Sequence, residues 1–391
     1  MLGRRDLLRL RLRSLLLAGW GDACRAGPET SGEPHDRAAG IVRHLLAVQA
    51  QDFPASKWAL GVRSGARLAD AERAYMSGHV VRSWPMRGTL HAVAADDAGW
   101  LQRLTSAKVL GVSAERRRES LGIDAGHIEK VRECVIGALT GGRALSRDAL
   151  LGEVADRGIE VPGRWKYHLI WFLAQTGTLV FGPVADGEPL LVLADEWIAH
   201  PRTLDREEAL AELAARYMAS HGPATVDDLA WWSGLGKREI AHGLMLAGGR
   251  VVRIDADGGT AYWMSPEVAD DAGEGPASAA VALLPAFDEH LLGYRDRSLV
   301  LNPAHAAAIC PGGNGIFRPV VAVGGVCGGT WRAASRGALK KLAADAPVPV
   351  TVTWFDEPAR RSADPASLRA AADRYARYLG RKRAQVTAEV A

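Results

Sequence analysis

The feature that most constrains the fold is a unit of three helical segments followed by a two-stranded hairpin. It is clearest in residues 127–194, where helical patterns at 127–141, 146–158 and 163–177 precede two strand patterns. Ser146 is a suitable N-cap for the second helix. Asp186-Gly187 between the strands favours a tight turn. This order predicts a winged helix-turn-helix, whose third helix is the one presented to DNA.

The same order recurs on both sides of this segment, as a repeat of pattern and not of identity. Downstream, three helical segments and a hairpin occupy residues 207–264. Upstream, residues 36–94 contain a looser copy, in which a helix over 36–52 is expected to end near the motif Gln49-Ala50-Gln51. We therefore predict an α+β fold with three tandem winged helix-turn-helix units, which occupy residues 1–110, 111–200 and 201–272.

The pattern changes beyond residue 273. Strand patterns begin at 281, 315 and 348, and one helix is expected over 367–383, so residues 273–391 are predicted to form a β-rich α/β domain. At the N-terminus, arginines interrupt the leucines, which favours an amphipathic helix over a signal peptide. No apolar run approaches the roughly 20 residues that a membrane span needs.

The composition is that of a globular protein with room for a basic face. The 391 residues are 48% hydrophobic, and the net charge is +3. Arginine dominates the basic residues, which fits phosphate contact but also the codon bias of a GC-rich genome. The cysteines have neither metal-ligand nor disulfide-framework spacing and fit a reducing cytoplasm: Cys24, Cys134, Cys310 and Cys327. With no HExxH, no clustered histidines and no P-loop, we expect no metal and no cofactor.

Several ordered motifs carry a family resemblance. They are "HLLAVQAQD", "SWPMRGTLHAVAADDAGWL", "LPAFDEHLLGYRDRS" and "FRPVVAVGGVCGGTWR". In this order they resemble the winged-helix DNA-binding family whose characterised members are AlkZ-type DNA glycosylases, over about residues 4 to 380. The resemblance implies three winged helices arranged as a C around a DNA cleft, followed by a β-rich element. It also implies removal of N7-alkylated guanines and, in some members, unhooking of interstrand crosslinks made by antibiotics.

The resemblance assigns catalysis to two glutamines. The family signature of Gln, an apolar residue and Gln matches Gln49-Ala50-Gln51. Alkylation at N7 makes guanine cationic, so the base can leave without a general acid. Amide oxygens can then orient a water and stabilise a developing cation. Extended backbone places both side chains on one face, whereas a helix would separate them by about 200°. Pro54 disfavours helix at Phe53, which favours the extended form.

Alternatives exist for each residue of the motif. The two glutamines could have no catalytic role and simply satisfy backbone groups at a helix junction. Asp52 could contribute a carboxylate to catalysis, or it could cap the next helix near Ala55, which is slightly favoured. A lyase-type enzyme would need a lysine nucleophile. Lys57 is the one lysine near the motif, which weakly favours a monofunctional hydrolase.

Basic residues at equivalent positions are predicted to contact DNA. They are Arg82, Arg87 and His91 in the first hairpin, Arg164, Lys166 and His168 in the second unit, and Lys237 and Arg238 in the third. Arg87 and His91 could instead hold the hairpin to the core. The turn Arg295-Asp296-Arg297 could contact DNA, although an internal ion pair is favoured. The hairpin tip at 257–260 could insert beside a lesion.

Together these features predict a cytoplasmic bacterial DNA glycosylase that acts as a monomer on double-stranded DNA with an alkylated guanine. Three winged helices in one chain suit a monomer that wraps a duplex. Two other functions fit the fold: a non-catalytic DNA-binding protein that regulates or shields lesions, and a scaffold whose cleft binds another partner. General alkylation repair and resistance to a self-made antibiotic give the same sequence pattern.

Overall fold

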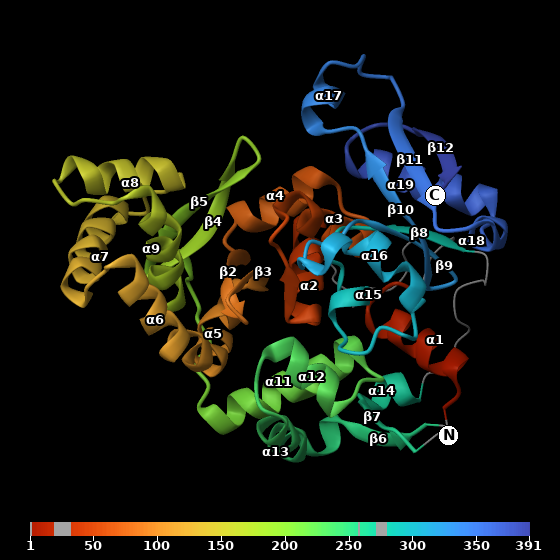
Figure 1. Cartoon of the computed structure of the whole chain (residues 1–391), viewed down its shortest axis with the longest axis horizontal. Coiled ribbons are helices and arrows are strands. Elements are labelled where there is room, and N and C mark those ends of the chain that lie inside the picture. The colour runs from red at the N-terminus through yellow and green to blue at the C-terminus, as the bar shows by residue number, and fades with distance from the viewer. Residues whose placement is uncertain (1, 19–32, 257–258, 271–279) are drawn as a thin grey trace.

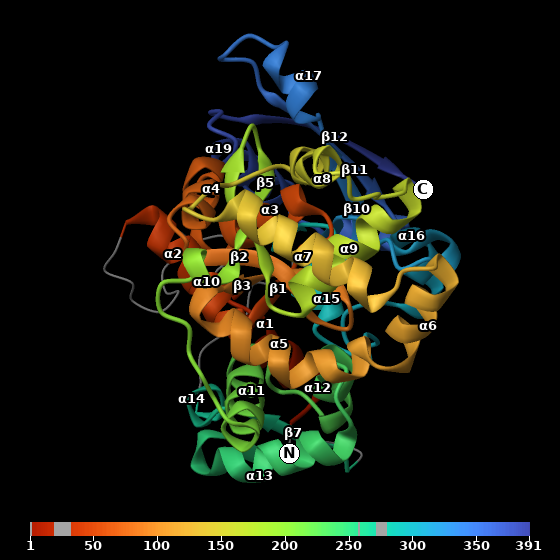
Figure 2. The same cartoon turned by 90° about the vertical axis from the view of Figure 1, so that its left-hand side faces the viewer.

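The computed structural model describes residues 2–18, 33–256, 259–270 and 280–391. Figure 1 shows the first predicted unit at the centre of the molecule, with the second unit on one side, the third below and the C-terminal strands above. The view turned by 90° shows α13 and α17 at opposite ends (Figure 2). None of the helices in the described ranges combines the length and apolar character that a membrane crossing requires.

The first unit contains the expected three helices and hairpin, with one added strand. Its elements are α2 (Pro34–Leu45), β1 (Ala47–Gln49), α3 (Phe53–Ser64), α4 (Leu68–Met76), β2 (Val80–Met86) and β3 (Thr89–Ala94). The expected helix over 36–52 is wrong beyond Leu45. Leu46 has φ 66°, and β1 then pairs antiparallel with β3. The apolar run that looked helical is a short strand with every residue buried.

Two helices that the sequence patterns did not predict follow the first hairpin, namely α5 (Ala95–Leu110) and α6 (Val112–Leu121). The second unit then has the expected order, with α7 (Ala125–Leu139), α8 (Arg147–Asp156), α9 (Gly163–Gln175), β4 (Leu179–Ala185) and β5 (Glu188–Leu193). The Ser146 hydroxyl caps α8 by accepting from Ala149 N at 3.2 Å. Asp186 and Gly187 have φ 52° and 87°, as a tight hairpin turn requires.

The first two hairpins join in one sheet of order β1-β3-β2-β4-β5. The link between them is the antiparallel pair Arg82 and Phe181. Hydrogen bonding therefore continues across the predicted boundary at residue 110, and the domain limits stay predictions. The sheet fixes the position of β1, and with it Gln49, relative to the second unit.

The third unit also has three helices before a hairpin. A short helix, α10 (Ala194–Trp197), precedes this unit, whose elements are α11 (Arg206–His221), α12 (Val226–Ser233), α13 (Lys237–Ala247), η1 (Gly248–Arg250), β6 (Val252–Asp255), β7 (Ala261–Met264) and α14 (Pro266–Ala269). Thr225 caps α12 in a reciprocal capping box with Asp228. Of the hairpin tip predicted to meet DNA, Asp257 and Gly258 lie outside the described residues.

The C-terminal region builds a second sheet, of order β12-β11-β10-β9-β8. Its strands are β8 (Val281–Leu284), β9 (Val320–Val323), β10 (Val326–Ala333), β11 (Val348–Trp354) and β12 (Ala384–Val390), and its helical segments are α15 (Glu289–Leu292), η2 (Pro303–His305), α16 (Ala306–Ile309), η3 (Pro311–Gly313), α17 (Arg336–Lys340), α18 (Glu357–Ser362) and α19 (Pro365–Tyr378). Strand β12, which the sequence patterns missed, runs parallel to β11. The mixed, β-rich character predicted for this region is thus present.

The first helix, α1 (Arg4–Ser14), ties the chain's beginning to the third unit. Arg11 Nε donates to Pro223 O at 2.8 Å, and Ser14 Oγ donates to Gly222 O at 2.6 Å. Both arginine and serine are buried despite their polarity. The described cysteines, Cys134, Cys310 and Cys327, are free thiols, and Cys24 lies outside the described ranges.

Candidate functional site

A cavity of about 1240 Å³ lies where all four predicted segments meet. Its lining comes from the glutamine motif and α3, the first two hairpins, the start of α8, α12 and the loops of the C-terminal region: Gln49, Gln51, Asp52, Phe53, Pro54, Arg82, Arg87, Thr89, Ser146, Arg147, Asp148, Phe181, Glu188, Pro189, Trp231, Phe287, Leu292, Arg297, Asn314, Gly315, Ile316 and Phe317. Aromatic rings and arginines thus share one concave surface. Such a surface suits a flat, partly apolar ligand that carries phosphates.

Both glutamines of the motif reach this cavity. Gln49 ends β1 and is buried, while Gln51 is exposed. Gln51 N donates to Gln49 Oε1 at 3.0 Å, and Gln49 Nε2 lies 3.5 Å from Gln51 Oε1. The two amides therefore lie side by side, although only Gln49 belongs to strand β1 and the contact runs through the backbone N of Gln51. An amide oxygen has two lone pairs, so Gln49 Oε1 can still accept from a water.

The backbone around the motif is held on both sides. Ala50 N donates to Leu90 O at 2.8 Å, and Ala50 O accepts from Arg82 Nε at 2.9 Å. The guanidinium of Arg82 lies between two rings, 5.4 Å from the centroid of Phe53 and 5.1 Å from that of Phe181. Burial lowers the pKa of Arg82 to about 10, so the group stays charged at neutral pH.

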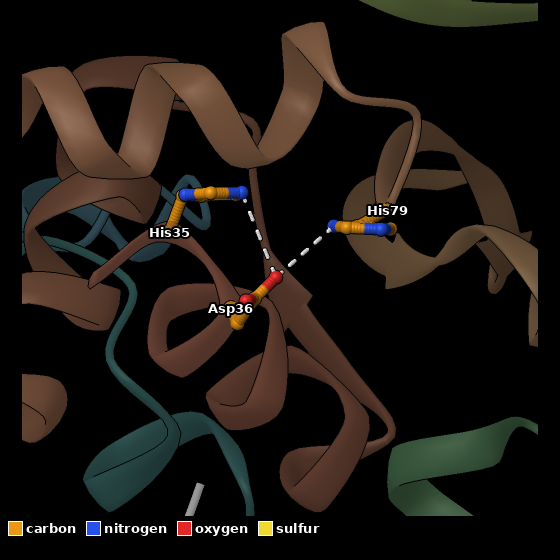
Figure 3. A group of neighbouring side chains, drawn as sticks. All are labelled: His35, Asp36 and His79. Atoms are coloured by element: carbon orange, nitrogen blue, oxygen red, sulfur yellow. Dashed lines mark ion pairs between the residues drawn. The ribbon is translucent and has the colours of Figure 1, made fainter. Parts of the chain in front are cut away.

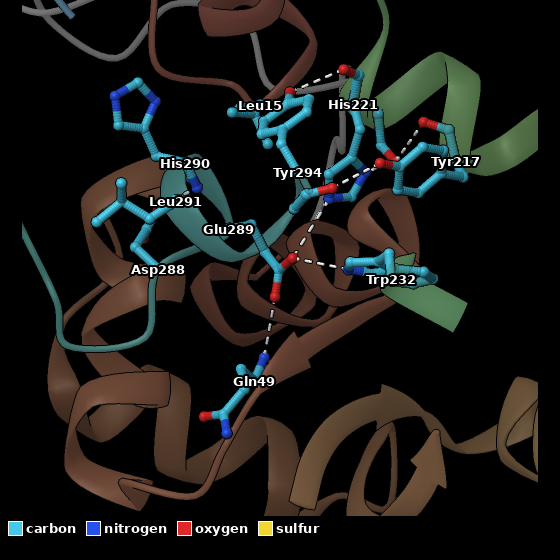
Figure 4. A network of polar contacts seen from close by, with 12 residues as sticks. Leu15, Gln49, Tyr217, His221, Trp232, Asp288, Glu289, His290, Leu291 and Tyr294 are labelled. Atoms are coloured by element: carbon cyan, nitrogen blue, oxygen red, sulfur yellow. Dashed lines mark hydrogen bonds and ion pairs between the residues drawn. The ribbon is translucent and has the colours of Figure 1, made fainter. Parts of the chain in front are cut away.

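A buried carboxylate anchors strand β1, which carries Gln49 (Figure 4). Glu289 Oε1 accepts from Gln49 N at 3.2 Å, and Oε2 accepts from Trp232 Nε1 at 2.9 Å. His221 Nε2 lies 3.4 Å from the same Oε2. Burial alone would raise the pKa of Glu289, but the proximity of His221 and the hydrogen bond from Trp232 outweigh it and hold the pKa below its ordinary value. Glu289 is therefore an anion that links β1 to α11 and α12.

The preceding residue reinforces this anchor. Asp288 accepts two hydrogen bonds from Arg63, at 2.9 and 2.8 Å, and both side chains are fully buried. Arg63 belongs to α3, the helix that follows the glutamine motif. Asp288 also caps α15 by accepting from His290 N at 2.9 Å. Two consecutive acids of the C-terminal region thus bind the elements on either side of Gln49 and Gln51.

Asp52 is the N-cap of α3, because its Oδ1 accepts from Ala55 N at 2.9 Å. The capping interpretation is confirmed, while a second role in the cavity stays open. Lys57 is buried and pairs with Glu72 at 2.8 Å. It also lies over Phe53, 4.3 Å from the ring centroid, and is not among the lining residues. Its amine serves packing between α3 and α4.

The residues of the first hairpin predicted to contact DNA have different environments. Arg87 lines the cavity, with its guanidinium 4.6 Å from the Trp231 ring centroid. His91 pairs with Gln49 across the sheet and is 0% exposed. Burial lowers the pKa of His91 to about 4, so it is neutral at pH 7. A side chain with no exposed surface cannot reach a phosphate, so the DNA contact predicted for His91 is replaced by the packing role.

Basic residues of the second unit form a surface that we call the α6–α9 face. Arg117, Arg164, Tyr167, His168 and Trp171 are among the residues that line a recess of about 340 Å³ on it. Arg164 and Lys166 are exposed, as the predicted phosphate contact would require. His168, in contrast, is buried, and burial followed by the charges of Arg118 and Arg117 lowers its pKa to about 4. A neutral, buried histidine is a poor phosphate ligand. Arg117 of α6, which the sequence analysis missed, is exposed at the same recess.

In the third unit, Arg238 is exposed, whereas Lys237 pairs with Asp227 at 2.6 Å. Asp227 also pairs with Arg295 at 2.8 Å, so the ion pair expected within the turn is instead formed with α12. Arg297 turns into the cavity, 5.1 Å from the Trp231 centroid and 5.0 Å from that of Phe317. The motif "FDEHLLGYRDRS" was the available signal for Glu289 and Arg297, but only packing reveals where their side chains point.

One group in the described residues has the ligands and spacing for a metal ion. Ligand atoms of His35, Asp36 and His79 all lie within 4.8 Å of one another (Figure 3). The sequence analysis recognised no clustered histidines, because these two are far apart along the chain. His35 and Asp36 belong to α2 and His79 directly precedes β2, and none of the three lines the cavity.

Comparisons with known proteins identify the family and the fold. The family model described as DNA glycosylase AlkZ-like matches residues 42–378. An interstrand DNA cross-link repair glycosylase of Streptomyces sahachiroi is 26% identical over 309 residues, covering 75% of this chain and 81% of that protein. The solved structure of Streptomyces sahachiroi DNA glycosylase AlkZ superposes with a TM-score of 0.74 at 22% identity, over 99% of both chains. The mixed α and β fold predicted from the sequence is therefore confirmed, and the chain belongs to the AlkZ-like DNA glycosylase family.

Proposed function

We propose that this protein hydrolyses the N-glycosidic bond of N7-alkylated guanine in double-stranded DNA, with bulky adducts and interstrand crosslinks as substrates. The observation that carries the proposal is the meeting of Gln49 and Gln51 on the wall of the large cavity. The cavity volume of about 1240 Å³ exceeds the roughly 300–1,000 Å³ usual for small-molecule sites. It therefore has room for a base that carries a large substituent.

In this mechanism the two amides orient the attacking water. Gln49 Oε1 and Gln51 Oε1 accept its hydrogens, so that a water lone pair faces the anomeric carbon. The same oxygens present negative dipole ends to the oxocarbenium-like transition state. The alkylated base departs with the electron pair of the broken bond and becomes neutral, so no acid is needed, and the attacking water releases its proton to bulk solvent as the new C–O bond forms. No lysine nucleophile takes part, which makes the enzyme a monofunctional hydrolase.

The cavity walls would hold the substrate on either side of the reacting bond. Phe53, Phe181 and Trp231 offer faces for a flat cationic base, which aromatic rings attract. Arg147 and Arg297 lie where phosphates of the flanking nucleotides could be bound. The three helix-plus-hairpin segments act as winged helices that together form a C-shaped cleft around the duplex, with the α6–α9 face on its backbone.

Glu289 acts in this scheme as a positioning residue. It touches neither water nor base, since it is 2% exposed and lies behind β1. By accepting from Gln49 N it fixes the residue whose side chain must hold a water. Its negative charge also lies on the cavity's reverse side, where it favours the developing cation. The protein is proposed to work as a monomer, in the bacterial cytoplasm.

The test is base release from defined duplexes that carry either N7-methylguanine or an antibiotic-derived N7 adduct or crosslink. The wild type should produce abasic sites, and Gln49→Ala and Gln51→Ala should each lose about two orders of magnitude in rate while DNA affinity is kept. Equal rates in wild type and both variants would refute the two-glutamine mechanism. Tight binding without release on all these substrates would instead identify a non-catalytic DNA-binding protein.

A further inference from the structure

Three potential metal ligands meet on the surface of the first unit, away from the cavity (Figure 3). His35 and Asp36 lie in the first turn of α2, and His79 directly precedes β2. The Oδ1 atom of Asp36 lies 3.6 Å from His35 Nε2 and 3.6 Å from His79 Nδ1. Figure 3 shows the two rings on opposite sides of the carboxylate, each with a nitrogen directed toward it.

These contacts are close but do not form hydrogen bonds between the three groups. A separation of 3.6 Å exceeds the usual range of an N–H···O bond. The imidazole planes are nearly parallel, at 6°, so both rings approach the same oxygen in a similar orientation. Ser77 Oγ lies 3.2 Å from His79 Nδ1 and is the neighbour that competes for this nitrogen. The three ligand atoms therefore surround a position that one small cation could occupy.

We propose that His35, Asp36 and His79 bind a divalent first-row transition ion of the zinc class. Two imidazole nitrogens and one carboxylate oxygen are ligands that zinc accepts, whereas magnesium and calcium prefer oxygen alone. Tetrahedral ligands at zinc distances lie about 3.3–3.5 Å apart. The 3.6 Å separations between Asp36 and each imidazole need only a small closure. The two imidazole nitrogens lie within 4.8 Å of each other and must also approach, and the side chain of His79, 51% exposed, has space for that movement. Water completes the coordination.

The ion would join two parts of the unit that carries the glutamine motif. Helix α2 leads through Leu46 into β1, and β2 pairs with β3, the neighbour of β1. A bound ion would therefore fix the start of α2 to the connection between α4 and β2. Since the three ligands converge only in the folded chain, binding would stabilise the native state by mass action. This role is independent of the proposed glycosylase chemistry.

The test is zinc titration of the tag-free full-length chain by calorimetry, together with thermal unfolding at rising zinc concentration. One ion should bind per chain, and the midpoint of unfolding should rise. His79→Gln and Asp36→Asn should weaken zinc binding by at least about tenfold, since mutating residues that only hydrogen-bond the metal ligands already lowers metal affinity by that factor. Ser77→Ala removes the competing hydroxyl and should bind zinc at least as tightly as wild type.

His305→Gln is the matched control. His305 is another histidine beside an aspartate, 3.4 Å from Asp356. Within the described residues, these two have no third potential metal ligand close enough to complete a site. The control should bind zinc like the wild type, and a large excess of magnesium should not displace the ion. No binding, equal binding by wild type and His79→Gln, or a loss in His305→Gln would each overturn the proposal. Circular dichroism of the zinc-free variants verifies that all are folded.

Discussion

At the scale of single residues, the site joins two uncharged side chains to a charged one that never reaches the cavity. Gln49 and Gln51 carry dipoles that suit a cationic substrate, because neither can be protonated or deprotonated near neutral pH. Glu289 has the opposite character, a full negative charge with no exposure to the substrate side. Glu289 acts by holding the backbone in place, since it accepts a hydrogen bond from Gln49 N.

Replacing this anchor tests its role. In Glu289→Gln, an amide donor faces Trp232 Nε1 or Gln49 N, so one hydrogen bond becomes a repulsion between donors. We expect the single-turnover rate of base release to fall by about 10–100-fold, with little change in DNA affinity. Trp232→Phe removes only one donor and should have a smaller effect. A parallel loss of DNA affinity and rate in Glu289→Gln would show a merely structural role.

Buried histidines predict how stability responds to acid. Burial lowers the pKa of His91 and of His290 from 6.5 to about 4. As the pH falls, the unfolded chain therefore binds protons at a higher pH than the folded chain does. The contribution of these neutral histidines to the free energy of unfolding is complete above pH 6.5 and is lost as the pH falls toward 4. The loss should reach roughly 2 kcal/mol per histidine between pH 7 and pH 5. Urea unfolding across this range measures it, and His91→Gln should flatten the dependence; an unchanged slope would contradict the assignment.

At the scale of elements, Asp52 at the start of α3 has two possible functions, capping the helix and contributing a carboxylate to catalysis, and these can be tested separately. Asp52 caps the helix, so Asp52→Ala should cost about 1 kcal/mol of unfolding free energy. Asn caps as well as Asp but carries no charge. If Asp52 only caps, Asp52→Asn keeps both stability and the rate of base release. A normal unfolding midpoint with a large loss of rate would instead give its carboxylate a part in catalysis.

Local signals predicted most elements correctly. Ser146 and Thr225 mark the starts of α8 and α12, and Asp186-Gly187 marks a hairpin turn, because caps and turns are decided by neighbouring residues. The segment after Leu45 was predicted wrongly as helix, since a buried apolar run fits either a helix or a central strand. Pairing with β3 decides it, and that partner is distant in the sequence. The missed strand β12 depends in the same way on β11.

At the scale of the whole molecule, the exposed basic residues predict how DNA affinity depends on salt. Arg164→Ala and Lys166→Ala should each weaken binding to any sequence and reduce the slope of log affinity against log salt by about one. Lys237→Ala should have less effect, because Asp227 already compensates that charge. Filter binding or fluorescence anisotropy at several salt concentrations measures the slopes. If all three variants kept the wild-type slope, the duplex would not contact these residues and would have to bind another surface.

The cavity itself could not be predicted from the sequence. The glutamine motif identified one wall, because a short motif carries its own spacing. Trp231 comes from α12 and Phe317 from a distant loop, and neither stands out where it occurs in the chain. Arg297 was noticed only as part of a charged turn, and its place in the cavity was not predicted. Their meeting depends on how the units pack. His91 shows the reverse case, since its place in a basic hairpin suggested a DNA contact and its burial excludes one.

The order of these segments along the chain also sets when the enzyme can become active during its synthesis. Gln49 and Gln51 emerge early from the ribosome, but Glu289 and Phe317 emerge only after most of the chain has been made. A nascent chain that stops before α15 would carry the glutamine motif without its anchor and with part of the cavity wall missing. Under the proposed mechanism, an unfinished copy would thus hold both glutamines and still be unable to cut a base from DNA.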